Sequence, residues 1–148
     1  MSKLKTIFVA IVVMVFFMGC MSMNNKVKIS NTDSLEGFST SVISLLTDVT
    51  YLKREVTKVN ASKPAIQRFI SESDQLWEKR KVKESLLILE RALRISKNEP
   101  AIYLRLAHIN LEEGFIEDAK GFAARGLLIE GLSSWERVLL SVYSDIKS

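Results

Sequence analysis

Apolar residues follow three different patterns along this chain, and each pattern predicts a different kind of element. An unbroken apolar run extends from Ile7 to Met18. Between residues 35 and 61 the apolar positions alternate in steps of three and four, and from residue 66 onward a longer pattern repeats. Only 6 glycines and 2 prolines are present, which disfavours a β-sandwich because that fold needs many turns. The sequence therefore predicts an all-α protein.

The first twenty residues have the features of a secretory signal. Lys3 and Lys5 precede the apolar run, which ends at Gly19-Cys20, and polar residues follow. A basic start, a short apolar core and a small residue before the cleavage point are typical of such signals. The segment resembles a bacterial lipoprotein signal peptide, in which a small residue directly precedes the acylated cysteine.

This resemblance implies a signal peptide over 1–19, lipidation of Cys20 and a polar tether over 20–34. It places the chain on the periplasmic side of the outer membrane, with the inner membrane as the alternative. An uncleaved N-terminal anchor and ordinary secretion are the other interpretations of the leader. All three place residues 24–148 outside the cytoplasm.

Residues 35–61 are expected to form one long helix with a heptad pattern, ended by Pro64. One interpretation is a coiled coil that makes a homodimer, and the other is an amphipathic helix that docks on the following domain. The expected seam is the set of apolar residues at the first and fourth heptad positions: Leu35, Phe38, Val42, Leu45, Val49, Leu52, Val56 and Val59.

Residues 66–99 and 100–133 match each other when the chain is offset by 34 residues. Small residues match small ones, as in Ser73 with Ala107 and Ser85 with Ala119, and aromatic Phe69 matches Tyr103. This period and the second copy, PAIYLRLAHINLEEGFIEDAKGFAARGLLIE, resemble the tetratricopeptide repeat (TPR), a helix–turn–helix unit. The resemblance implies a short helical-hairpin solenoid, and residues 134–148 are expected to form its capping helix.

In TPR folds the first helix of each pair lines a concave groove, so the resemblance also implies a groove in this chain. It would bind another envelope protein, unless residues 35–61 or a second protomer fill it. The candidate groove residues are apolar or charged side chains on the first helices and the cap: Ile70, Asp74, Trp77, Leu104, Arg105, His108, Leu111 and Trp135.

Composition argues against catalysis and nucleic-acid binding. The chain has one histidine and one cysteine, so neither a zinc site of several imidazole or thiolate ligands nor an internal disulfide can form. The net charge of +4 includes two leader lysines and is too small to favour nucleic acid. We therefore expect no catalytic residues, metal or cofactor, and a membrane-anchored TPR adaptor. The alternative is a structural subunit that oligomerises through the heptad segment and the TPR faces.

Overall fold

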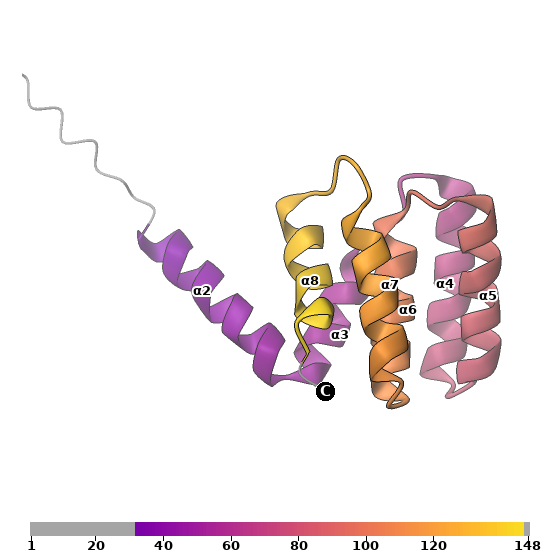
Figure 1. Ribbon diagram of the computed structural model, residues 1–148, viewed down its shortest axis with the longest axis horizontal. Coiled ribbons are helices and arrows are strands. Elements are labelled where there is room, and N and C mark those ends of the chain that lie inside the picture. The colour runs from indigo at the N-terminus through magenta and orange to yellow at the C-terminus, as the bar shows by residue number, and fades with distance from the viewer. Residues whose placement is uncertain (1–31, 147–148) are drawn as a thin grey trace, which may run out of the picture. The chain divides into compact units, whose positions relative to one another are not determined.

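The computed structural model describes residues 32–146, with the side chains of 32–36 and Phe38 left out (Figure 1). This part of the chain is entirely helical, which confirms the all-α class. The predicted signal peptide, Cys20 and most of the tether lie outside the described residues. No helix within 32–146 is both long and apolar enough to cross a membrane. The helices are α2 (Thr32–Thr47), α3 (Val49–Lys58), α4 (Pro64–Glu78), α5 (Val82–Ile95), α6 (Pro100–Glu112), α7 (Ile116–Leu127) and α8 (Ser134–Ser144).

The heptad segment differs from the expected single helix, because it is divided at Asp48. Asp48 has an extended backbone, with φ of −127° and ψ of 102°. Its carboxylate accepts hydrogen bonds from the backbone N–H groups of Thr50 at 2.8 Å and Tyr51 at 3.1 Å. An aspartate at this place satisfies the free N–H groups of a new helix, and so α3 begins at Val49.

Helices α4 to α8 pack against one another in chain order, each on the next (Figure 1). Pro64 and Pro100 stand in the first turn of α4 and α6, where a missing N–H costs nothing. Ser133 and Glu136 form a reciprocal capping box at the start of α8. Helix α3 leaves this order and packs against both α6 and α8.

The turns of the two helical hairpins lie 34 residues apart, so they are equivalent positions of the two repeat copies. Gly114 has a φ of +83° between α6 and α7, and Arg80 has a φ of +60° between α4 and α5. A left-handed backbone favours glycine because it has no Cβ. Arg80 therefore has the same left-handed turn conformation as Gly114, although arginine is less favourable than glycine in that conformation.

Small residues bring the helices of each pair together. Ser73 and Ser85 are fully buried where α4 meets α5, and their hydroxyls lie 2.8 Å apart. In the second pair a Cβ added at Gly126 would lie 2.8 Å from Leu140 Cδ2 and 3.0 Å from Tyr103 Cβ. The close approach of α7 to α6 and α8 thus depends on a residue without a side chain.

Candidate functional site

Most of the predicted groove residues are buried, and they lie on α4, α6 and α8. Ile70, Leu104 and His108 have no exposed surface, while Arg105 is 1% and Trp77 3% exposed. The remaining members of the predicted set are half-buried: Asp74, Leu111 and Trp135. The surface that these residues form is therefore covered by another part of the same chain.

Helix α3 is the segment that covers them. Leu52 and Val56 of α3 are buried in one core cluster with Leu104 of α6 and Leu139 of α8, and Leu45 of α2 belongs to the same cluster. The predicted seam is thus divided: three of its members are buried within this chain, Val59 is half-buried, and Val42 and Val49 are not in the core. The side chains of Leu35 and Phe38 lie outside the described residues.

Arg105 holds the C-terminal end of α3. The last carbonyl groups of a helix have no partner within it and attract cations. Arg105 Nε and Nη2 donate to the two carboxylate oxygens of Asp74 at 2.7 Å and 2.8 Å. Its two terminal nitrogens also donate to backbone carbonyls: Thr57 at 3.0 Å, Val59 at 2.9 Å, Val56 at 3.4 Å and, within α6, Ala101 at 3.2 Å. A buried guanidinium is thereby fully hydrogen-bonded.

Lys53 attaches the middle of α3 to the groove. Its ammonium group lies 3.2 Å from Glu112 Oε1 and 3.7 Å from the centre of the Trp77 ring. Trp77 Nε1 donates to the other oxygen of Glu112 at 2.8 Å. Burial by itself raises the pKa of Glu112, but the hydrogen bond from Trp77 and the charge of Lys53 outweigh it, so that the pKa is lowered. The ammonium group of Lys53 is therefore held by both the Trp77 ring and the Glu112 carboxylate on one side of α3.

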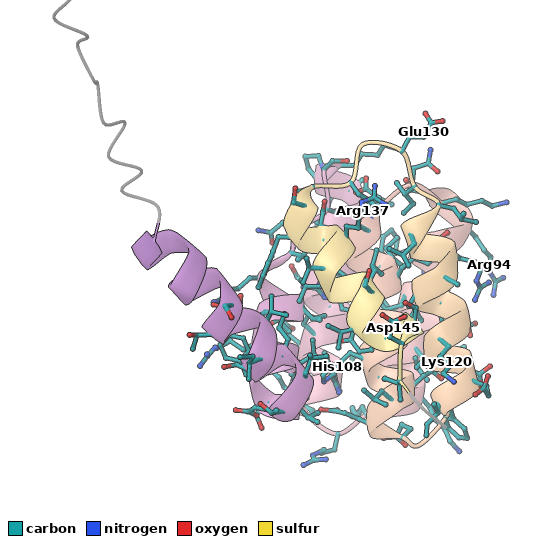
Figure 2. All side chains as sticks on the ribbon, turned by 60° about the vertical axis from the view of Figure 1, so that its left-hand side comes forward. Arg94, His108, Lys120, Glu130, Arg137 and Asp145 are labelled. Atoms are coloured by element: carbon teal, nitrogen blue, oxygen red, sulfur yellow. The ribbon has the colours of Figure 1, made fainter. Side chains whose placement is uncertain are left out.

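His108 lies in the interior beside this cluster (Figure 2). Its Nδ1 is 2.7 Å from the hydroxyl of buried Tyr143, and its ring meets Trp77 edge to face at 5.3 Å. Burial lowers the pKa of His108 to about 4, although the Glu112 carboxylate opposes this shift. The ring is thus neutral at pH 7, and the 3.4 Å approach of Nε2 to Glu112 is not an ion pair there. The ring packs between the side chains of Trp77 and Tyr143, edge to face with both.

Two contributors were not among the residues predicted for the groove: Lys53 and Tyr143. In the sequence, Lys53 looks like any lysine on the exposed face of a helix. Its partner, Glu112, is 59 residues away along the chain. Glu112 stands one turn after His108 on α6, and the TPR resemblance implies the same groove-facing side for both residues. Tyr143 belongs to α8, the predicted capping helix. The sequence pattern does not predict how close this helix lies to α6.

The arrangement holds helix α3 through hydrogen bonds, one ion pair and one cation–π contact. No set of three histidine, cysteine, aspartate or glutamate side chains suited to a metal ion occurs in the part of the chain that the structure describes. Comparison with models of protein families, with curated proteins and with solved structures found no match to this chain.

Proposed function

We propose that this chain is a non-enzymatic, membrane-tethered adaptor of TPR type in the bacterial envelope. Its concave groove binds a helix of another envelope protein. The observation that carries this proposal is that the groove residues hold a helix, α3, by contacts to its terminal carbonyls and to one side chain. A partner helix would compete with α3 for these same contacts.

The repeat supports the TPR interpretation. Helices α4 and α5 lie in the first copy and α6 and α7 in the second, and each pair packs together. The matched small positions are buried in both copies, as Ser85 and Ala119 illustrate with no exposed surface. The matched turn positions Arg80 and Gly114 share a left-handed backbone. Two copies bury little core by themselves, which gives α3 and α8 a structural reason to close the unit.

The chemistry of the groove supports helix binding. Partner-binding energy in protein interfaces is concentrated in buried aromatic and arginine side chains, and Trp77 and Arg105 are such residues. Arg105 recognises backbone carbonyls of a helix end, so its contacts do not depend on the side chains of that helix. A foreign helix with an apolar face and a free C-terminal end would present the same groups as α3.

A second candidate is a structural subunit that associates with copies of itself. The observation that favours it is the exposure of apolar side chains at the end of α2 and the start of α3, namely Ile43 and Leu46 of α2 and Val49 of α3. This surface lies outside the groove, so the two candidates do not exclude each other.

Site-specific photo-crosslinking in bacterial cells tests the groove proposal. A photoreactive amino acid at Ser71, an exposed position of α4 between the predicted groove residues Ile70 and Asp74, is expected to give a discrete adduct with one envelope protein. The matched control is the same amino acid at Leu87, which is 63% exposed on α5. Adducts at both positions alike, or at Leu87 alone, would contradict groove binding.

The tether is tested separately by labelling cells with a radioactive or clickable fatty acid. Wild type is expected to incorporate the label and to stay in the membrane fraction, whereas Cys20→Ser is expected to lose the label. Membrane retention of both proteins without any label would instead identify an uncleaved anchor.

A further inference from the structure

Helix α2 exposes an apolar strip that its own chain leaves uncovered. Leu45 is 2% exposed and packs into the core, but Ile43 is 58%, Leu46 65% and Val49 54% exposed. Val42 is half-buried beside them. Val49 is the first residue of α3, directly after the break at Asp48. These four residues, which we call the α2 strip, bring several large apolar side chains together at the C-terminal end of α2 and the start of α3. Such a concentration marks a docking surface more often than scattered single residues do.

The polar residues of α2 are also unlike those of a helix that faces water. No charged residue lies between Glu36 and Asp48, whereas solvated helix faces are normally rich in lysine and glutamate. The hydroxyls of Ser41, Ser44 and Thr47 each donate to a carbonyl four residues earlier in α2, at 2.9–3.0 Å. Since their hydrogens are bonded within the helix, these three hydroxyls leave no donor unsatisfied where another helix packs against α2.

An apolar groove lies next to the α2 strip, between α2 and α8. Its volume is about 540 Å³, and it opens to solvent. Its walls are Val42 and Leu46 of α2, together with Leu132, Val138 and Val142. Arg137 of α8 and Asp145, the residue that caps the C-terminal end of α8, also line it; Figure 2 labels both side chains. This surface is separate from the groove that holds α3.

We propose that the occupant of this groove is α2 of a second copy of the chain, in a reciprocal two-fold arrangement. The α2 strip and the apolar groove are neighbours on one surface, so each copy offers a helix and a place for the partner's helix. A surface that is complementary to itself in this way closes as a dimer. The inference does not depend on what the α3 groove binds.

Charge supports a second copy over a lipid surface. The apolar part of α2 is flanked by acidic Glu36 and Asp48 and contains no lysine or arginine, so anionic head groups would repel it. Asp48 is exposed, and Arg137, which lines the groove, is exposed as well, so a second α2 can bring a carboxylate to a guanidinium. The uncharged middle of the partner's α2 would then contact the apolar walls of the groove.

Sedimentation equilibrium of the full chain, in detergent matched to the density of the solvent, tests this inference. Wild type is expected to sediment as a dimer. Leu46→Glu should raise the dissociation constant at least about tenfold, because it buries a charge in the interface. Leu128→Glu makes the same change at a leucine that is 82% exposed and outside the strip, and it should leave the dimer intact. Circular dichroism should show equal helicity for all three proteins.

A disulfide experiment in cell membranes checks which helix meets which. With Cys20 left in place, so that the tether is intact, Leu46→Cys is expected to form an intermolecular disulfide on mild oxidation, and neither Leu128→Cys nor wild type is. A monomeric wild type, equal effects of the two glutamate variants, or crosslinking of Leu46→Cys only to a different protein would each overturn the inference. None of these outcomes would affect the proposal that a partner helix binds in the groove of α3, which photo-crosslinking at Ser71 tests.

Discussion

Arg105 and Asp74 form a two-point ion pair, at 2.7 Å and 2.8 Å, whose guanidinium also binds the end of α3. The pair joins two helices of different repeats, α4 and α6, to a third helix that precedes both. Its geometry explains why α3 stays in the groove although it is only 10 residues long. A helix of that length is marginal in isolation, so its tertiary contacts must stabilise it.

Removal of Arg105 should therefore destabilise the whole domain. Arg105→Ala leaves Asp74 and several carbonyls without their donor, and we expect a loss of about 3–5 kcal/mol in the free energy of unfolding. The matched control is Arg94→Ala, an exposed arginine 3.9 Å from Glu90, with an expected change below about 0.5 kcal/mol. Urea denaturation measures both. Similar losses for the two variants would show that the buried pair does not hold α3.

His108 should make stability depend on pH between about 4 and 6.5. Its pKa is about 4 in the folded chain, against 6.5 when unfolded, so in this window the unfolded chain binds a proton that the folded chain excludes. The free energy of unfolding should therefore fall as pH is lowered through this range, by on the order of 3 kcal/mol in total. Glu112, whose pKa is lowered on folding, adds a loss of the same sign that begins near the lower end of this window. Denaturation across pH compares wild type with His108→Gln, in which the fall should be much smaller.

The two glycines of α7 should respond in opposite ways to alanine. Gly126→Ala places a Cβ within 3.0 Å of Tyr103 Cβ, and we expect a destabilisation of about 1–2 kcal/mol from overpacking. Gly121 has nothing within 4 Å of that position, so Gly121→Ala should stabilise the helix by about 0.5–1 kcal/mol. Thermal unfolding of both variants is the measurement. Stabilisation by Gly126→Ala would mean that the helices approach less closely than the structure shows.

Arg80→Gly should stabilise the chain by about 0.5–1 kcal/mol, since a left-handed arginine costs more than glycine's added freedom when unfolded. Gly114→Arg at the equivalent turn should destabilise it. Chemical denaturation of the two variants checks the sign of each change. A destabilising Arg80→Gly would imply that the arginine side chain makes a contact that outweighs its backbone strain.

The periodic part of the fold could be predicted from the sequence because it depends on local spacing. The recurrence of Ser73, Ala107, Ser85 and Ala119 marks positions that are all buried, and the all-α class follows from composition and period. These signals are repeated along the chain, so each one supports the next.

The break at Asp48 is a different case, because two local signals compete there. The seam continues without error through Val49, yet the Asp48 side chain caps a new helix. A heptad pattern predicts which face is apolar, but it does not say which partner covers that face. Leu45 and Leu52 are covered within the chain while Val49 is exposed, and only the three-dimensional arrangement separates them.

The composition of the site was partly predictable for the same reason. Trp77, Arg105 and His108 could be placed on one surface because the resemblance to TPR implies that the first helices of the two copies face the same groove. Their partners Lys53 and Tyr143 come from segments whose position depends on tertiary packing. The sequence therefore predicts the groove residues better than it predicts the helix that occupies them.

Competition between α3 and a partner helix is the central claim, and Lys53→Glu tests it most directly. This variant replaces the contact with Glu112 by repulsion and should loosen α3 without removing its apolar residues. The yield of the partner adduct at Ser71 is then compared with that of wild type and of Lys81→Glu, a control at an exposed lysine that pairs with Glu84. We predict about five- to tenfold more adduct in Lys53→Glu, because the free groove is more populated, and no change in Lys81→Glu. An unchanged or lower yield in Lys53→Glu would contradict the claim that the partner uses the groove of α3.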